Sequence, residues 1–175
     1  MTEKKCADAA TARMIRVDQA GEYGAARIYA GQLAVLGRGK DSDTIRRMAE
    51  KEREHLRDFN QLMVARRVRP TALAPVWHVA GFALGAATAL MGPKAAMACT
   101  EAVEDVIVEH YAQQEAALGD DDPQLRGLIE QARADEAEHA ATAVQSGARD
   151  TPCHGPLTDA IRAGTRLAIW LSERV

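Results

Sequence analysis

Two Glu-x-x-His pairs constrain this sequence more than any other feature. Glu52 and His55 lie in the run EKEREHLRDF, and Glu136 and His139 lie in RADEAEHAAT. Because the two members of each pair are three residues apart, they share one face of a helix. A solvated helix surface does not require such a pair, whereas a metal-binding helix does. One pair alone would be explained by chance, but two pairs indicate a site.

Each pair is preceded by a glutamate at a similar distance. Glu22 comes 30 residues before Glu52, and Glu104 comes 32 residues before Glu136. This order predicts a repeated helical hairpin joined by a long crossover, which is typical of a four-helix bundle with a metal site in its core. The six side chains suffice for two iron ions, because four carboxylates balance the charge of two ferrous ions. Imidazole and carboxylate ligands suit iron or manganese better than structural zinc.

The rest of the chain is also predicted to be helical. Alanine is abundant and aromatic residues make up only 4% of the sequence, which favours helix over strand. Asp122 is the expected N-cap of a helix that begins at Pro123. The predicted helices cover about residues 8–36, 42–67, 75–92, 93–118, 123–147 and 157–173. We therefore expect an all-α fold and a single domain over residues 1–175.

Two tyrosines are expected to face the same site. Tyr29 follows Glu22 by seven residues, and Tyr111 follows Glu104 by seven. Seven residues are two helical turns, so each phenol shares the inward face of its glutamate. From there it can hydrogen-bond a metal ligand or a reactive intermediate.

Several other acidic and histidine residues lie near the motifs without joining the predicted site. Glu101 is the nearest rival of Glu104, because it lies one turn earlier. We expect the acidic neighbours on the surface or behind the ligands: Glu50, Glu54, Glu101, Glu109, Asp135 and Glu138. His110 is a candidate hydrogen-bond donor behind the ligands, although an ordinary packed or exposed histidine is the favoured interpretation. His78 and His154 are given no role.

Composition excludes some other classes of protein. The net charge of -3 gives no reason to expect nucleic acid as a partner. Cys6, Cys99 and Cys153 form no CxxC motif, which argues against a disulfide framework or a thiolate metal site and suits a reducing compartment. The first residues contain no apolar signal-peptide core, so we expect a cytoplasmic protein or a mature form.

The predicted crossover, residues 75–92, contains no Asp, Glu, Lys or Arg. Residues 76–92 are short for a spanning helix, so an interfacial helix on a membrane surface is the favoured interpretation. Arg66, Arg67 and Arg69 precede it and can meet anionic headgroups. A buried core helix or a subunit contact is the alternative. The run GFALG has the small-xxx-small pattern that favours self-association, so a homo-oligomer is also considered.

Three longer runs resemble one known family. MIRVDQAGEYGAARIYAGQLAVLGR, RVRPTALAPVWHVAGFALGAATALMGPKAAMACT and AGTRLAIWLSERV are similar to the demethoxyubiquinone hydroxylases of ubiquinone biosynthesis, which are ferritin-like di-iron monooxygenases. The resemblance extends from about Ala12 to Val175, with mild departures at Glu101 and Glu109. It implies the same metal ligands that the spacing selects: Glu22, Glu52, His55, Glu104, Glu136 and His139.

The resemblance also implies a reaction. Two iron ions would use dioxygen as co-substrate to hydroxylate a polyprenyl-methoxy-methyl-benzoquinol, demethoxyubiquinol. The sequence has no Gly-x-Gly-x-x-Gly motif after a strand, so external electrons, from NADH for example, are expected to arrive through the quinone. Expected partners are the polyprenylated quinol and a membrane surface, with a second copy of the chain and accessory proteins of ubiquinone biosynthesis as further candidates. The expected location is the cytoplasmic face of a bacterial inner membrane, or the matrix side of the mitochondrial inner membrane.

Two other functions are compatible with the carboxylate pattern. A ferroxidase or iron-storage bundle would use the same ligands without an organic substrate. A lipid-binding helical scaffold without catalysis would keep the carboxylates only for structure. Metal analysis separates the scaffold from the other two, because a scaffold should purify without about two irons per chain.

Overall fold

The computed structural model describes residues 8–37 and 40–175, and within them every regular element is a helix. Cys6 lies outside the described residues. The bounds are α1 Ala9–Leu36, α2 Lys40–Arg66, α3 Ala74–Leu90, α4 Pro93–Leu118, α5 Pro123–Gln145, a 3-10 turn Ala148–Asp150 and α6 His154–Ser172. The prediction of an all-α fold is confirmed.

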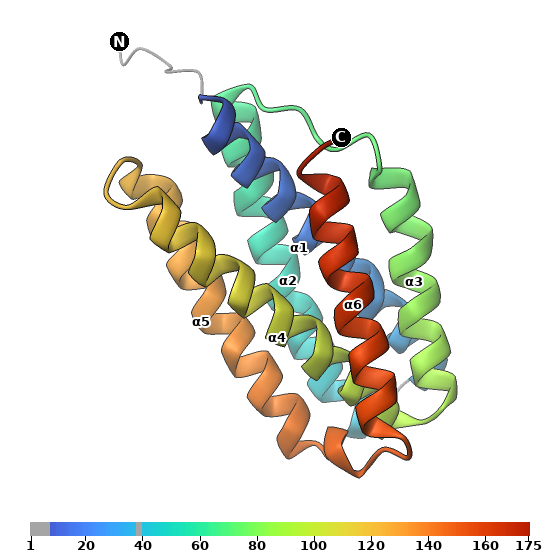
Figure 1. Cartoon of the computed structure of the whole chain (residues 1–175). Helices are drawn as coiled ribbons and strands as arrows, with labels where there is room; N and C mark the ends of the chain where they lie inside the picture. The colour runs from blue at the N-terminus through green and yellow to red at the C-terminus, as the bar shows by residue number, and fades with distance from the viewer. Residues whose placement is uncertain (1–7, 38–39) are drawn as a thin grey trace.

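Four long helices form a ferritin-like bundle (Figure 1). The hairpins α1–α2 and α4–α5 pack side by side, and each contributes one lone glutamate and one Glu-x-x-His pair. The crossover helix α3 packs along α1, and α6 packs mainly on α4. The start of α1 and the end of α6 lie at the same end of the bundle (Figure 1). Because α3 packs along the outside of α1, the connection between the hairpins leaves the core to the four long helices.

Residues around the first turn explain where α5 and α6 begin. The side chain of Asp122 accepts a hydrogen bond from the Leu125 N–H at 3.1 Å, so the predicted cap of α5 is confirmed. Helix α6 begins at His154, three residues before the predicted start. The loop was predicted to extend to Pro156, but a proline in the first helical turn loses no intrahelical hydrogen bond, so the helix can include it.

Glycine allows α3 to lie directly on α1. A Cβ atom on Gly85 would be 1.9 Å from the backbone oxygen of Ile28, and one on Gly81 would be 2.9 Å from that of Gly24. The two glycines of GFALG therefore serve a contact within the chain. They are not free for the self-association that the sequence pattern suggested.

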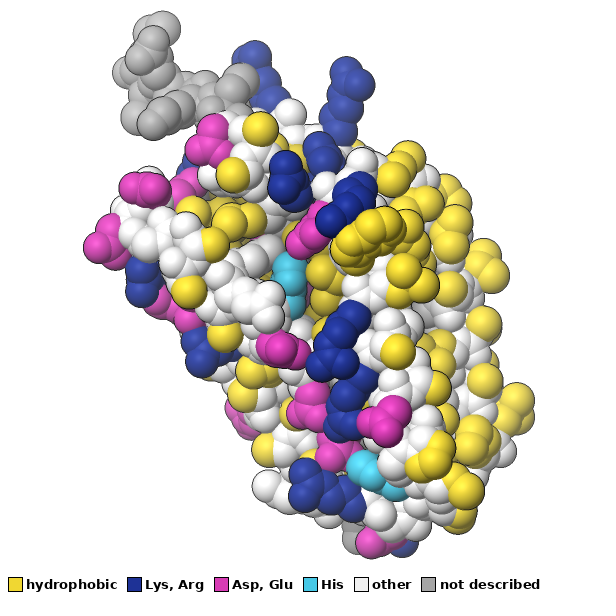
Figure 2. All heavy atoms as spheres, viewed as in Figure 1, with side chains coloured by type: hydrophobic (Ala, Val, Ile, Leu, Met, Phe, Trp, Pro, Cys, Tyr) yellow, Lys and Arg dark blue, Asp and Glu magenta, His cyan; other side chains and the backbone are white. Residues whose placement is uncertain are grey.

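One side of the molecule is covered by apolar side chains. In Figure 2 they gather along the right-hand side, where Figure 1 draws α3. The large exposed apolar residues on and next to these helices are Val76, Val79, Leu90 and Met91 of the α3 region, and Leu167 and Trp170 of α6. We call this surface the α3–α6 face. Among the described residues, no helix has the length and apolar character needed to cross a membrane.

Candidate metal centre

The six predicted ligands converge in the core of the bundle. Helices α1 and α4 contribute one glutamate each, and α2 and α5 contribute one Glu-x-x-His pair each. None of the six residues is more than 6% exposed. The buried side chains are Glu22, Glu52, His55, Glu104, Glu136 and His139.

The six residues form two overlapping groups of four. Glu22 and His55 belong to one group, Glu104 and His139 belong to the other, and Glu52 and Glu136 belong to both. Within each group the potential ligand atoms lie within 4.8 Å of one another. The two shared carboxylates are therefore in a position to bridge two metal ions, each of which would have its own histidine and its own terminal glutamate.

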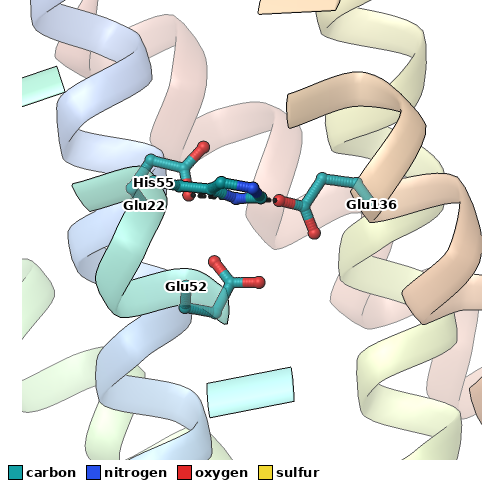
Figure 3. Close-up of side chains that lie close together, drawn as sticks. All are labelled: Glu22, Glu52, His55 and Glu136. Carbon is teal, nitrogen blue, oxygen red and sulfur yellow. Dashed lines mark hydrogen bonds and ion pairs between the residues drawn. The ribbon is translucent and has the colours of Figure 1, made fainter. Parts of the chain in front are cut away.

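His55 is oriented from both sides of its ring. Its Nδ1 lies 3.0 Å from Glu136 Oε1 and 3.5 Å from Glu22 Oε2, as Figure 3 shows. Its Nε2 lies 2.9 Å from Asp135 Oδ2, outside the cluster. A carboxylate behind a histidine fixes the ring orientation and raises its basicity as a ligand. Asp135, which we expected on the surface or behind the ligands, is behind them.

The second histidine has a matching position. His139 Nδ1 lies 2.9 Å from Glu136 Oε2 and 3.1 Å from Glu52 Oε1. Each Nδ1 atom is thus directed at one of the shared carboxylates. Glu136 accepts from both histidines, one on each carboxylate oxygen.

The electrostatics are unfavourable without a cation. Burial and the neighbouring carboxylates raise the pKa of Glu52 and Glu104 well above the usual range. Burial would also raise the pKa of Glu136, but hydrogen bonds from His139 and His55 outweigh it and lower that pKa. Although burial opposes it, hydrogen bonds to Glu136 and Glu22 raise the pKa of His55 to about 11. A proton on the His55 ring thus provides positive charge beside the carboxylates.

The pattern of unpaired atoms fits bound metal. Both oxygens of Glu52 and Oε2 of Glu22 are buried and accept no hydrogen bond, although His139 Nδ1 lies 3.1 Å from Glu52 Oε1 and His55 Nδ1 lies 3.5 Å from Glu22 Oε2. Such atoms are costly in a protein interior unless they coordinate an ion or are protonated. Oxygen and imidazole donors without thiolates suit iron or manganese. The residues present therefore fit two divalent cations of that class.

The two tyrosines form hydrogen bonds across the bundle. Tyr29 of α1 donates a hydrogen bond to Glu104 Oε1 of α4 at 2.8 Å. Tyr111 of α4 donates to Glu22 Oε1 of α1. Burial and the adjacent carboxylates raise both phenol pKa values well above the usual range, so both remain hydrogen-bond donors. Each tyrosine contacts the glutamate of the opposite helix rather than the one on its own helix.

Glu101 is not a rival ligand. It is buried, but its carboxylate bonds Arg149 Nε at 3.0 Å and His154 Nε2 at 2.7 Å. Burial opposes ionisation, yet these two partners lower the pKa of Glu101. The contact between Glu101 and His154 holds the start of α6 against α4. His154 therefore has a structural partner, which its sequence position in a predicted loop had not indicated.

The other acidic neighbours lie outside the centre. Glu109 pairs with Arg166 at the surface, at 3.2 Å. The exposed residues of this set are Glu50, Glu54, Glu109 and Glu138. The Tyr23 hydroxyl and His78 Nδ1 form a hydrogen bond at 2.6 Å on the outside of α1 and α3.

An apolar cavity of about 300 Å³ lies between α1, α3, α4 and α6. Gly21 and Val103 line it, and each precedes one of the terminal glutamates, Glu22 and Glu104, in the chain. The other lining residues are almost all apolar, from Trp77 near the start of α3 to Ile169 of α6. Sequence reasoning did not find this cavity, because its walls come from four helices and carry no local motif.

This fold and this cluster define a class of proteins. They are ferritin-like helical bundles whose four core helices present carboxylate and histidine side chains to a pair of metal ions. A family model described as "Ubiquinone biosynthesis protein COQ7" matches residues 9–172. The chain belongs to this family, as the resemblance of its motifs had predicted.

Several curated relatives are similar over most of their length. The "3-demethoxyubiquinol 3-hydroxylase" of Rhodospirillum rubrum is 54% identical over 164 residues, which cover 93% of this chain and 77% of the relative. The human "NADPH-dependent 3-demethoxyubiquinone 3-hydroxylase, mitochondrial" is 50% identical and covers 100% of this chain and 82% of its own length. The "5-demethoxyubiquinone hydroxylase, mitochondrial" of Saccharomyces cerevisiae is 42% identical, with coverages of 93% and 77%.

Proposed function

We propose that this protein is an oxygen-dependent di-iron monooxygenase that hydroxylates demethoxyubiquinol in ubiquinone biosynthesis. The observation that carries the proposal is the pair of overlapping ligand groups that share Glu52 and Glu136. Membership of the family and the names of the relatives support the substrate and the reaction. Residues 9–172 are proposed to form one di-iron domain.

The cavity supports an apolar substrate. Its walls are nearly free of charge and its size is that of a small-molecule site, so it suits a quinol ring with the first part of a polyprenyl tail. Gly21 and Gly24 of α1 face it without side chains, which leaves room for a flat ring near Glu22. Trp77 donates to the Ser172 hydroxyl at 3.0 Å and holds α3 and α6 together beside the cavity.

The chain's own residues bind, orient and exclude water. Six side chains hold the metal ions: Glu22, Glu52, His55, Glu104, Glu136 and His139. Asp135 fixes the ring of His55, and Tyr29 and Tyr111 hold the two terminal glutamates from across the bundle. Iron, when bound, supplies the reduction of dioxygen that these side chains cannot perform. The apolar surroundings keep competing water away from the reaction.

Electrons must come from outside the chain, because hydroxylation by dioxygen consumes two. Several relatives are named NADPH-dependent. A nicotinamide donor is therefore proposed, and the bound quinone would receive its electrons and supply the two that hydroxylation needs. Dioxygen and the quinol are the two substrates in this scheme.

The test is product formation by the iron-loaded protein. The chain is loaded with ferrous iron without oxygen, then given oxygen, a demethoxyubiquinone with a short tail and a nicotinamide. We expect a product heavier by one oxygen atom, with the label coming from ¹⁸O₂. Iron oxidation without any organic product would favour the ferroxidase alternative. Purification without bound iron, and failure to take it up, would favour the scaffold.

A membrane surface is proposed as the source of the substrate. The α3–α6 face is apolar and borders the cavity, and Val79 on this face is 67% exposed. Arg67 and Arg69 lie exposed near the start of α3 and are available to anionic headgroups. Arg66 is not, because its guanidinium binds Asp122 at 2.8 Å and 3.0 Å. Peripheral attachment to the cytoplasmic or matrix side is proposed accordingly.

Liposome binding tests this surface with a matched pair of variants. Val79→Asp places a charge on the α3–α6 face, whereas Val64→Asp places one on α2, where Val64 is 76% exposed. Val79 is a better position than Leu84, because Leu84 lines the cavity. We expect only Val79→Asp to reduce cosedimentation with vesicles. Unchanged vesicle binding, together with a change from dimer to monomer, would assign the face to contact between copies instead.

A further inference from the structure

A second polar network lies beside the metal centre and reaches towards solvent. Asp18 of α1 is one helical turn before Glu22, and its side chain is 0% exposed. His110 of α4 lies next to Tyr111 in the chain, and its side chain is 12% exposed. The two come within 3.4 Å, from His110 Nε2 to Asp18 Oδ1. Nothing in the proposed ligand set requires either residue.

Gln114 joins the two residues. Its Nε2 donates to Asp18 Oδ1 at 2.7 Å and lies 2.9 Å from His110 Nε2. Gln114 thus lies against both groups and holds the imidazole ring of His110 beside the carboxylate of Asp18. The other carboxylate oxygen, Asp18 Oδ2, is buried and has no hydrogen-bond partner. Asp18 therefore meets the network through Oδ1, while Oδ2 has no partner.

The outer end of the network opens into a surface hollow. A pocket of about 220 Å³ is lined by His110 and Gln114, together with Arg13 of α1 and Glu173 after α6. These are the charged groups around His110 on the outer side. On the inner side, Glu22 follows Asp18 by one turn of α1, and its charge contributes to the raised pKa of Asp18. The network thus connects a surface hollow with the turn of α1 that carries a proposed metal ligand.

The inner carboxylate is placed to exchange a proton near neutral pH. Burial raises the pKa of Asp18 to about 6, although hydrogen bonds and charge from His110 and a hydrogen bond from Gln114 lower it. The charge of Asp18 also contributes to the raised pKa of Tyr111, so the two groups are close enough to interact. A group that is neither fully protonated nor fully ionised at the working pH transfers protons most effectively.

We propose that His110 and Asp18 form the proton path between solvent and the metal centre, an inference that rests on the proposed function. Hydroxylation breaks the O–O bond and a ring C–H bond, forms C–OH and water, and consumes two electrons and two protons. A nicotinamide donor gives both electrons and one proton as hydride, so the second proton comes from solvent. His110 takes this proton from the hollow at Nδ1 while its Nε2–H bond breaks and an O–H bond forms at Asp18 Oδ1. Asp18 then releases the proton towards the carboxylate of Glu22, and the proton ends in the product water.

Three variants of the iron-loaded protein test the path. Asp18→Asn keeps the size of the side chain but cannot carry the proton, and His110→Ala removes the outer group while leaving space at the hollow. Asp58→Asn, at an exposed position of α2, is the charge-matched control. We expect the first two to slow hydroxylation at least about tenfold, since general acid–base groups contribute roughly 10²–10⁴-fold. Iron content should stay unchanged.

Two readouts distinguish a proton path from a structural role. They are rescue of the variants by added imidazole, and a solvent isotope effect on hydroxylation that is larger in the variants than in the wild type. Added imidazole should restore His110→Ala, because it can enter the hollow, and should not restore Asp18→Asn, whose missing group is buried. A merely structural network would give no rescue and no change in the isotope effect, and either result overturns the proposal. An active wild type with an equally active Asp18→Asn would refute the path alone. An inactive, iron-loaded wild type would refute the proposed function.

An infrared titration of the metal-free protein tests the pair without measuring activity. Because it uses two variants, a folding defect in one of them does not decide the result. The difference between the infrared spectra of wild type and Asp18→Asn should contain a band of the protonated carboxyl group. This band should titrate near pH 6, because the pKa of Asp18 is about 6. In His110→Ala its midpoint should move upwards, because a contact that lowers the Asp18 pKa is lost. A band unaffected by His110→Ala would show that the two residues do not exchange a proton.

Discussion

The metal-free protein should become more stable when Glu52 is replaced by glutamine. Glu52 is 0% exposed, neither of its oxygens has a hydrogen-bond partner, and burial followed by repulsion from Glu136, Glu22 and Glu104 raises its pKa. Two charges about 4.8 Å apart, the upper limit within each ligand group, repel by about 3 kcal/mol at an effective dielectric constant of 20. Glutamine keeps the shape of the side chain and removes the charge.

Proton uptake sets an upper limit on this effect. The folded-state pKa of Glu52 is raised above its unfolded value of 4.5, so its contribution to stability is fully present below pH 4.5 and is lost as the pH rises through the folded pKa. At pH 7 the loss cannot exceed the cost of keeping the carboxyl protonated, which is about 1.4 kcal/mol for each of the 2.5 pH units between 4.5 and 7, or about 3.5 kcal/mol. Glu52→Gln should therefore stabilise the metal-free protein by up to about 3 kcal/mol at pH 7 and by almost nothing at pH 4.5.

Urea unfolding of metal-free protein at several pH values measures the effect. Glu54→Gln is the control, because Glu54 lies on the same helix but its side chain is 56% exposed. Its free energy of unfolding should change by less than about 0.5 kcal/mol. The reasoning is refuted if Glu52→Gln lowers stability at pH 7, or if its effect is the same at pH 4.5 and pH 7.

Two further substitutions test the packing and capping of the bundle. Gly85→Ala should destabilise the fold by about 2–3 kcal/mol in urea unfolding, because the new Cβ would meet the Ile28 carbonyl. Gly127→Ala, where no atom lies within 4 Å of the added Cβ, should instead be neutral or stabilise by up to about 1 kcal/mol, and equal effects at both sites would contradict the close packing of α3 on α1. Asp122→Ala should cost about 1–2 kcal/mol, since it removes both the cap of α5 and the partner of Arg66; an unchanged midpoint would show that this cap is dispensable.

The ligand set could be predicted from the sequence because helical geometry is local. A spacing of three residues places Glu52 beside His55 in any helix, and the repeated distance to a lone glutamate indicates a second hairpin of the same kind. The helices could be placed for the same reason. Proline, glycine and aspartate at their ends act within a few residues, as the capping of α5 by Asp122 illustrates.

Contacts between distant segments had no such local signal. Tyr29 bonds a carboxylate 75 residues away, and Glu101 meets His154 from 53 residues away. Arg66 was expected at a membrane surface, yet Asp122 binds it 56 residues later in the chain. Each of these partners is determined by how the helices pack, which follows from the whole core and not from any short run.

Asp18 illustrates the same limit at the site. Its position one turn before Glu22 was visible in the sequence, and an aspartate at that spacing is compatible with a solvated helix face. Only the packing of α4 against α1 brings His110 and Gln114 to it and removes it from water. The burial of a polar side chain, rather than its residue type, was the missing observation.

Mössbauer spectroscopy of the protein loaded with ⁵⁷Fe tests the central claim most directly, because it reports both the number of irons and whether they share ligands. The two groups that share Glu52 and Glu136 predict two irons per chain and, after oxidation, an exchange-coupled pair. Glu136→Ala should abolish the coupling, whereas Glu138→Ala, at an exposed position two residues later, should leave it intact. One iron per chain, two uncoupled irons, or a coupled pair that survives Glu136→Ala would contradict the proposed centre.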